Sequence, residues 1–556
     1  MLQDNLSSAN RPRSMNGDLE GNRKVSRLVQ RPNQMTVNEA LELFKASGGE
    51  KVQILRPFAV FSGRSYSTPL TVPIGPAYLA GMLEAAGYSV DVIDGIGEGI
   101  HNVIPSADGE LKFQGLTVEE IIDRVDPLTR LLGVSLMFSQ DWVQHRDLIR
   151  AIKGARPNLT IVVGGEHVTA MPEYVLEDCA EVDYLITGEG ELTFLEFASG
   201  HFKDQDLGKL PGLCYRDHDG EIVNNGLGQR VADFANLPRP AWHLCNVENF
   251  FTGMWSMGIG FGRNILILAT RGCPYQCTFC SNPTMWTTRY LMRPATDVVD
   301  EIEHLIAEYG ANSFDFADLT AIVKKSWVLE FCAEIKRRKL EIIWQLPSGT
   351  RSEALDGETV QAIYDAGCKL IVYAPESGSR DTLRVIKKKL SLEKLVASVR
   401  GALKVGHTIK LNLIIGFPHE RRRHIFETLL FTIRMAFYGT DDCNISIFSP
   451  YPGSELYDEL REQGTIPEIS DEYFNSLLAQ FDFTLPKGYC QHVSGRELAI
   501  YRFLGMGSFY GISYLLHPGR LLRLVTKVFR ADFQPRNLFE QRIYDNISRR
   551  RLLKQG

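Results

Sequence analysis

The sequence contains no apolar run of about 18 residues, the length that a membrane-spanning helix requires. No apolar stretch follows the first charged residues, so we expect no signal peptide. Ten cysteines in 556 residues are too sparse for a secreted disulfide scaffold. The net charge is only −6, which argues against a general nucleic-acid-binding protein. These absences predict a protein of the reducing cytoplasm whose partners do not include nucleic acid.

What is present is an ordinary globular composition. Hydrophobic residues make up 44% and charged residues 23% of the chain, which excludes a mostly disordered or collagen-like protein. The length suits three to four domains. Basic residues gather toward the C-terminal end, where residues 519–556 contain ten Lys or Arg and three Asp or Glu.

Residues 1–48 are polar, and we interpret them as a disordered tail. Over residues 50–200, short apolar strands alternate with helices, which predicts a doubly wound, Rossmann-like α/β domain with a parallel sheet. The expected strands are 51–57, 89–93, 132–138, 160–163 and 184–186, and the expected helices are 76–86, 119–131, 143–155 and 173–178. Residues 201–260 are interpreted as a linker with a hairpin at 213–223.

A second α/β series fills residues 261–455. The expected strands are 265–270, 313–317, 342–346, 370–374, 410–415 and 444–448, and the expected helices are 296–309, 324–339, 358–366, 392–404 and 420–438. Six strand–helix pairs predict a partial (β/α)6 TIM-like barrel, with its active site at the C-terminal ends of the strands. Residues 456–556 are expected to form a helical region with a basic tail.

The strongest chemical signal is a cysteine motif directly after the first barrel strand. Cys273, Cys277 and Cys280 have the spacing C-x3-C-x2-C. Three thiolates on one short loop can converge on a metal centre. A structural zinc site normally takes four N or S ligands, and a 4Fe–4S cluster is usually held by four cysteines. Three ligands leave one iron open for a substrate or cofactor, and the other seven cysteines form no second C-x2-C pair.

This motif resembles the signature of the radical SAM family, and the resemblance covers about residues 260–455. It implies that Cys273, Cys277 and Cys280 ligate three irons of a 4Fe–4S cluster, while the fourth iron binds S-adenosylmethionine (SAM). It further implies one-electron cleavage of SAM to a 5′-deoxyadenosyl radical. An external electron donor such as flavodoxin or ferredoxin is expected.

Further positions resemble segments that contact SAM in this family. Phe279 is similar to the aromatic residue that flanks the adenine. Glu376 and Ser377, after the fourth strand, resemble the segment near the ribose. Gly416 and Pro418 belong to a turn that resembles the one beside the adenine, although such residues also form ordinary turns in any α/β fold.

The second barrel strand departs from the family pattern. Many relatives place paired acidic residues there, whereas this chain offers only Asp315 and Asp318. We assign Asp318 to SAM binding on this resemblance. Gln345 and Arg351 flank the third strand end and could reach the SAM carboxylate or the substrate, but a surface role suits Arg351 equally well.

The first domain resembles the cobalamin-binding domain of a subclass of radical SAM proteins. The matching segments are 72–80, 133–135, 163–167 and 187–191. Glycines in such loops let the backbone approach a ligand closely. The resemblance implies that the corrin ring and its nucleotide tail are lined by Gly75, Ser135, Gly164, Gly165, His167, Gly188, Glu189 and Gly190.

One feature of that subclass is missing. The motif D-x-H-x-x-G, which would supply an axial histidine to cobalt, does not occur. Any cobalt is therefore expected to lack that ligand, and we interpret His167 as a tail or structural contact. A degenerate domain that binds nothing remains an alternative.

The C-terminal region combines apolar and basic residues. Residues 503–516 are uncharged. The basic residues Arg520, Arg523, Lys527 and Arg530 then alternate with the apolar residues Leu521, Leu522, Leu524, Val525 and Val528. This pattern suits either peripheral contact with an anionic membrane or a helical cap on the barrel. Membrane contact would favour a lipid-like substrate over other small molecules.

The leading hypothesis is a cobalamin-dependent methyltransferase that acts on an unactivated carbon. One alternative is a cobalamin-linked radical cyclase, rearrangement or oxidation enzyme without methyl transfer. Another is a non-catalytic cobalamin or redox sensor, although a sensor gains nothing from an open iron. A methylthiotransferase is disfavoured because the first domain lacks a second set of cluster cysteines.

Overall fold

The computed structural model describes residues 35–65, 69–466, 468–478, 482, 487–527, 530 and 533–553. Residues 1–34 of the predicted tail lie outside this range. The prediction that residues 1–48 are a disordered tail was wrong for residues 37–43, which form helix α1 (Val37–Leu43). Thr36 and Glu39 make a reciprocal capping box at its start, and Val37 and Ala40 are buried, so this helix is anchored in the core.

The first sheet has the strand order β10-β9-β8-β7-β6-β1-β3 in the described residues. Its strands are β1 (Lys51–Arg56), β3 (Ser89–Asp94), β6 (Leu131–Ser135), β7 (Thr160–Gly164), β8 (Tyr184–Ile186), β9 (Leu213–Arg216) and β10 (Ile222–Asn224). β1, β3, β6, β7 and β8 are parallel. The five predicted strands are confirmed, because each is a short apolar run whose core is buried on both faces.

The predicted hairpin belongs to this sheet instead of a linker. Leu213 pairs with Ile186, and β9 runs antiparallel to both β8 and β10. Gly220, with φ +83°, closes the turn and donates its N–H to the Asp217 carbonyl at 3.1 Å. The interpretation of residues 213–224 as linker was therefore wrong. The hairpin is held there because it pairs the backbone groups along the edge of β8.

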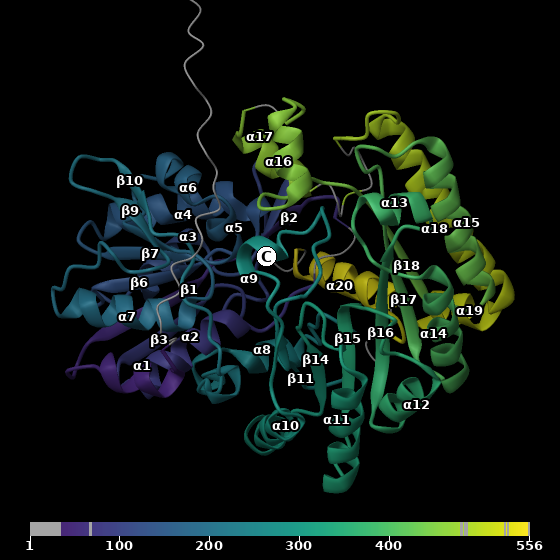
Figure 1. Cartoon of the computed structure of the whole chain (residues 1–556), viewed down its shortest axis with the longest axis horizontal. Coiled ribbons are helices and arrows are strands. Elements are labelled where there is room, and N and C mark those ends of the chain that lie inside the picture. Colours follow the sequence, from purple (N-terminus) through teal and green to yellow (C-terminus); the bar gives the residue numbers. More distant parts are fainter. Residues whose placement is uncertain are drawn as a thin grey trace, which may run out of the picture. The chain divides into compact units, whose positions relative to one another are not determined.

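Helices cover the first sheet, as Figure 1 shows. They are α2 (Ile74–Ala85), α3 (Val118–Arg124), α4 (Trp142–Ala155), α5 (Glu166–Ala170), α6 (Pro172–Asp178) and α7 (Gly190–Phe202). α3 ends seven residues earlier than predicted, since Pro127 disfavours helical backbone in the residue before it. A separate antiparallel sheet, which was not predicted, consists of β2 (Ala59–Ser62), β4 (Val103–Pro105) and β5 (Leu111–Gln114).

The second sheet is parallel throughout, with the order β11-β14-β15-β16-β17-β18 in the described residues. Its strands are β11 (Asn264–Ile267), β14 (Ser313–Phe316), β15 (Ile343–Thr350), β16 (Cys368–Glu376), β17 (Thr408–Ile415) and β18 (Asp442–Ile447). The helices between and after them are α10 (Ala295–Tyr309), α11 (Lys325–Arg338), α12 (Gly357–Asp365), α13 (Arg380–Val385), α14 (Leu392–Val405) and α15 (Arg422–Phe437). The predicted partial (β/α)6 barrel is confirmed.

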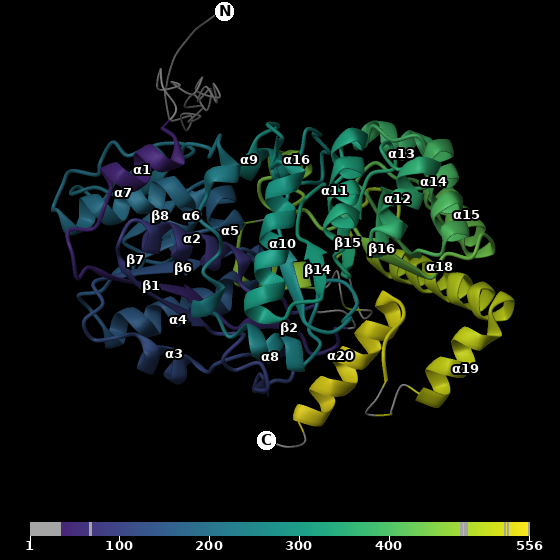
Figure 2. The ribbon, with the colours of Figure 1, turned by 90° about the horizontal axis from the view of Figure 1, so that it is seen from below.

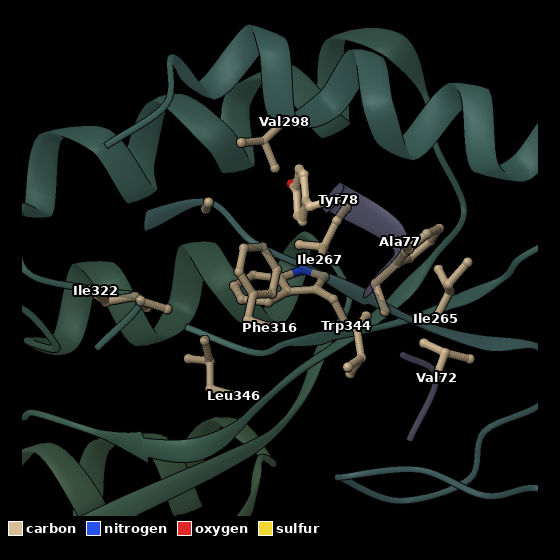
Figure 3. Packing of buried hydrophobic residues seen from close by; sticks show 14 of the residues in the cluster. Val72, Ala77, Tyr78, Ile265, Ile267, Val298, Phe316, Ile322, Trp344 and Leu346 are labelled. Atoms are coloured by element: carbon tan, nitrogen blue, oxygen red, sulfur yellow. The ribbon is translucent and has the colours of Figure 1, made fainter. Parts of the chain in front are cut away.

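Several short elements lie within and between the two sheet domains. They are the 3-10 helices η1 (Ser139–Asp141), η2 (Phe234–Asn236) and η3 (Trp242–Leu244), helices α8 (Val247–Thr252) and α9 (Asn282–Trp286), and the strand pair β12 (Thr270–Arg271) and β13 (Leu291–Met292). One buried apolar cluster runs through both sheets. In Figure 3, Tyr78 of α2 lies beside Ile267 of β11 and Val298 of α10. The two α/β units are therefore joined by a shared hydrophobic core.

The C-terminal region is helical, as predicted. Its helices are α16 (Glu455–Glu462), α17 (Asp471–Leu477), α18 (Gly495–Leu516), α19 (Pro518–Lys527) and α20 (Leu538–Leu552). α18 lies beside α15 in Figures 1 and 2, and it also packs on β18, the edge strand of the second sheet. None of the helices in the described ranges is long and apolar enough to cross a membrane. Val528, one of the predicted apolar residues, lies outside the described residues.

Candidate functional site

The cysteine loop runs from β12 to α9, at the C-terminal end of the first barrel strand. Cys273, Cys277 and Cys280 are free and partly exposed on it. The Thr278 N–H donates to the Ile386 carbonyl at 3.1 Å, and the Thr278 carbonyl accepts from the Leu456 N–H at 2.9 Å. The loop is thus tied on both sides by backbone hydrogen bonds that do not depend on a bound metal.

The donor set of this loop fits an iron–sulfur cluster better than a single ion. In the described part of the chain, no group of three His, Cys, Asp or Glu side chains could hold one metal ion. A four-iron cluster does not require the three thiolates to meet at one ion, because each thiolate binds its own iron. Burial raises the pKa of the Cys280 thiol to about 12, so a cationic centre is needed to stabilise the thiolate form.

A buried ion pair lies beside the cysteine loop. Glu376, the last residue of β16, accepts a hydrogen bond from Lys388 Nζ at 2.9 Å, and both side chains are about nine-tenths buried. Burial opposes the charge on Lys388, but Glu376 and Cys277 outweigh it and raise the pKa of the lysine. Glu376 has φ +67°, a left-handed backbone conformation that is costly for a residue with a side chain. Such strain is typical of functional sites.

Arg351, one of the two uncertain candidates, reaches the cysteine loop. Its guanidinium carbon lies 3.6 Å from the centre of the Tyr275 ring, between Cys273 and Cys277 in sequence. Its Nη2 also donates to Glu353 Oε1 at 2.7 Å. Gln345 is buried and engaged elsewhere, since its side chain accepts from the Ile259 N–H at 2.9 Å and donates to the Ile259 carbonyl at 2.8 Å.

Asp318 holds the start of the cysteine loop. Its carboxylate accepts hydrogen bonds from the Ala269 N–H, at 3.1 Å, and from the Thr270 hydroxyl. Burial raises the pKa of Asp318 to about 6, although these hydrogen bonds act in the opposite direction. The side chain therefore positions the segment that leads into Cys273, and its assignment to SAM remains a prediction.

The predicted adenine-side residues come together at the end of β17. The rings of Phe279 and Phe417 are 5.7 Å apart. Gly416, with φ +85°, and Phe417 donate their N–H groups to Glu420 Oε2, at 2.6 and 3.2 Å. Pro418 accepts from the Gln491 N–H at 3.0 Å. Ser377 lies nearby in the chain's core and shares a 2.9 Å hydroxyl contact with Thr428.

The predicted cobalamin-lining residues gather where the first sheet's parallel strands end. Ser135 and Gly164 are register partners at the ends of β6 and β7. Gly165 has φ +122°, and a Cβ atom there would lie 2.3 Å from the Leu136 carbonyl oxygen. A Cβ atom on Gly75 would meet nothing within 4 Å. Ligands of doubly wound sheets bind at this edge.

Two large apolar side chains stand exposed directly after β6. Met137 is 55% and Phe138 is 52% exposed. Exposed apolar side chains at this edge of the sheet fit a large planar ligand such as a corrin ring. Gly188, with φ +81°, and Gly190 follow β8 at the same edge of the sheet.

His167 is embedded in the protein core. Its ring packs against those of Trp142 and Phe474, with centroids 5.1 and 5.6 Å away, and its Nδ1 lies 3.0 Å from the Ser139 hydroxyl. Burial lowers the pKa of His167 to about 3, so the ring is neutral at physiological pH. This placement agrees with the interpretation of His167 as a structural contact.

Arg271, which the sequence analysis did not single out, joins the two sites. Its Nη2 donates to Glu191 Oε1 at 2.5 Å, and its Nη1 lies 3.6 Å from Glu189 Oε2. Glu189 is in turn bound by Arg230 Nε at 2.7 Å and the Val231 N–H at 2.9 Å. The segment after β8 is therefore connected to Arg271, which lies just before the cysteine loop.

A second contact connects the same regions. Glu166, which follows Gly165, accepts a hydrogen bond from the hydroxyl of Ser281, which follows Cys280. Neither Arg271 nor Lys388 carried a sequence signal of its own. Arg271 lies two residues before the cysteine motif, and Lys388 is one of three consecutive lysines, of which it alone is buried. Only the partners that Arg271 and Lys388 contact in the folded chain distinguish them from other basic residues.

Comparison with known proteins agrees with this geometry. Residues 67–198 match the B12 binding domain model, and residues 267–432 match the Radical SAM superfamily model. The chain belongs to the radical SAM enzymes that carry a cobalamin-binding domain. Its cofactors are a 4Fe–4S cluster, SAM and cobalamin.

Several relatives cover most of this chain. An uncharacterized methyltransferase of Pyrococcus horikoshii is 28% identical over 69% of this chain and 78% of its own length. The cytidylyl-2-hydroxyethylphosphonate methyltransferase of Streptomyces wedmorensis is 28% identical over 76% and 84%. An anaerobic magnesium-protoporphyrin IX monomethyl ester cyclase of Cereibacter sphaeroides is 25% identical over 72% and 62%. Among solved structures, the radical SAM methyltransferase TsrM of Kitasatospora setae has the same fold, with a TM-score of 0.62 and 17% identity over 91% of this chain and all of that one.

Proposed function

We propose that this enzyme transfers a methyl group to an unactivated carbon of a small-molecule or lipid-like substrate. When bound, the cluster and SAM supply a hydrogen-abstracting radical, and cobalamin supplies the methyl group. The observation that carries the proposal is the ion pair between Arg271 and Glu191. This ion pair holds the cysteine loop against the ligand-binding edge of the first sheet. Methyl transfer requires this proximity, because the substrate must reach both cofactors.

Other residues of the chain have positioning roles in this proposal. Asp318 fixes the backbone before Cys273, and Glu420 fixes the turn opposite Phe279. Lys388, paired with Glu376 beside Cys277, would stabilise the anionic charge of a bound cluster and of the SAM carboxylate. An external electron carrier such as flavodoxin or ferredoxin would reduce the cluster.

Methyl transfer is favoured over the alternatives by the relatives. Two of the relatives described above are methyltransferases. A cyclase or oxidation enzyme without methyl transfer is the second candidate, because an anaerobic ester cyclase also matches 72% of the chain.

The test is a joint measurement of two products. The protein is purified without oxygen, its cluster is rebuilt with iron and sulfide, and hydroxocobalamin, SAM, a reductant and fractionated lysate are added. Methyl transfer predicts both 5′-deoxyadenosine and S-adenosylhomocysteine. Deoxyadenosine alone would replace methyl transfer by the cyclase or oxidation function. Cys277→Ala should abolish both products, whereas Cys179→Ala, a substitution of a buried cysteine of the first α/β domain outside the motif, should retain them.

A further inference from the structure

Exposed apolar side chains are concentrated on three helices of the second half of the chain. Of the eighteen large hydrophobic residues that are exposed in the described residues, eleven belong to α15, α18 and α19. They are Phe426, Leu430, Phe437, Ile500, Phe503, Leu504, Leu515, Leu516, Leu521, Leu522 and Val525. A concentration of this kind on a protein surface marks an interaction site.

Helix α18 has two apolar faces, of which the fold uses only one. The inner face packs closely: a Cβ atom on Gly505 would lie 2.6 Å from side chains of both Ile445 and Leu429. The outer face presents Ile500 and Phe503, and Phe503 is 71% exposed. Packing within the chain therefore does not explain why the outer face of α18 is apolar.

The apolar surface continues from α18 onto α15. The ring of Phe426 contacts that of Tyr501, with centroids 5.3 Å apart. Phe426, Leu430 and Phe437 share one side of α15, because they are spaced by four and seven residues. α15 and α18 lie side by side in both Figures 1 and 2. These residues and the outer face of α18 form one continuous surface.

Helix α19 extends this surface and is attached to the protein by polar contacts. None of its ten residues is buried. Arg520 Nη2 donates to Asp441 Oδ1 at 2.7 Å, and Arg523 pairs with Glu540. Leu522 is nevertheless 67% and Val525 65% exposed. The arginines thus hold the helix while its apolar side faces away from the protein.

The charge around α19 selects the partner. The helix contains Arg520, Arg523 and Lys527 and no acidic residue. Lys527 and Arg530 are exposed at its C-terminal end. Anionic lipids complement such charges. A twofold contact between two copies of this face would instead bring like charges together.

We propose that the surface formed by the outer sides of α15, α18 and α19 docks on a membrane that contains anionic lipids. The apolar side chains would enter the boundary between headgroups and acyl chains, and Lys527 and Arg530 would contact lipid phosphates. This proposal rests on the surface alone and is independent of the reaction that the enzyme catalyses.

The test is co-sedimentation of the full-length, cofactor-loaded protein with vesicles. Phosphatidylcholine vesicles are compared with vesicles that also contain phosphatidylglycerol. The double variant Leu522→Glu, Val525→Glu and the single variant Phe503→Glu are compared with Leu128→Glu, which changes an 81% exposed leucine of the first α/β domain. We expect binding to the anionic vesicles, reduced at least about tenfold by the first two variants and unchanged by the control.

Any of three results would overturn the proposal. Two of them are the absence of binding to anionic vesicles and an equal loss of binding in Leu128→Glu. The third is a stable dimer in light scattering that Phe503→Glu dissociates, without vesicle binding by the wild type. The experiment measures vesicle binding and not catalysis. Its result would therefore stand even if the methyltransferase proposal failed.

Discussion

Arg271 and Glu191 form a buried ion pair, with 2.5 Å between Nη2 and Oε1, although 80 residues separate them in sequence. Glu189 lies 3.6 Å from the same guanidinium, and the two carboxylates raise the pKa of Arg271 against the effect of burial. The pair connects the first sheet's ligand edge to the residue two positions before Cys273. The Arg271–Glu191 pair, together with the Glu166–Ser281 contact, therefore links the two cofactor sites.

Glu191→Gln should weaken this connection. Removing one partner of a buried pair leaves an uncompensated charge, which typically costs about 3 kcal/mol. We expect a lower urea midpoint, followed by tryptophan fluorescence, and a loss of S-adenosylhomocysteine formation larger than the loss of iron. Glu393→Gln, which breaks the exposed pair with Arg380, is the control and should leave both unchanged. Equal effects of the two variants would contradict a linking role for Glu191.

Glu420 should make the stability of the enzyme pH-dependent. Burial raises the pKa of Glu420 to about 7 from its ordinary 4.5. Between these pH values the folded state binds more protons than the unfolded state, so stability falls as pH rises. Glu420→Gln keeps an acceptor for Gly416 and Phe417 but carries no charge.

The stability of Glu420→Gln relative to wild type should therefore rise from pH 4.5 to pH 7, by up to about 3 kcal/mol. Thermal midpoints measured across this range test it. Glu462→Gln, at an exposed position of α16, should follow the wild-type pH profile. A Glu420→Gln profile parallel to that of the wild type would show that Glu420 does not titrate in this range.

Lys388→Met should weaken SAM binding. The substitution removes the cation beside Cys277 and leaves the Glu376 carboxylate buried without its partner. If Lys388 also donates to the SAM carboxylate, loss of that charged hydrogen bond costs about 1.5–3 kcal/mol, which corresponds to a decrease in affinity of about tenfold or more. Equilibrium dialysis of SAM against the reconstituted enzyme measures the change. Lys389→Met is the matched control, because this neighbouring lysine is exposed; the same loss in both variants would remove Lys388 from the site.

Gly75→Ala should separate ligand binding from folding. A methyl group at Gly75 meets nothing within 4 Å in the protein, and the same is true at Gly154 on α4. Both variants should therefore fold, with thermal midpoints equal to or slightly above that of the wild type, because alanine favours a helix more than glycine does. If Gly75 lines the corrin ring, Gly75→Ala alone should retain less cobalamin after gel filtration, measured by its visible absorbance. Full retention would place the ring away from this residue.

Periodicity predicted the strands that are buried on both faces, and missed those that are not. The five parallel strands of the first sheet, such as Tyr184–Ile186, are apolar runs whose identity does not depend on distant residues. β2, β4 and β5 have three or four residues each and exist because they pair with one another. The hairpin of β9 and β10 was visible in its turn, but its attachment to β8 was not.

The cysteine loop and the alternation of strands and helices could be predicted from the sequence, because both depend on the local spacing of residues. Which charged side chains are buried, and which partners they contact, could be seen only in the folded chain. Glu189 and Glu191 face Arg230 and Arg271, and of three consecutive lysines only Lys388 is drawn inside. A charge is stable in the interior only beside its partner, and the partner's position is known only once the chain has folded.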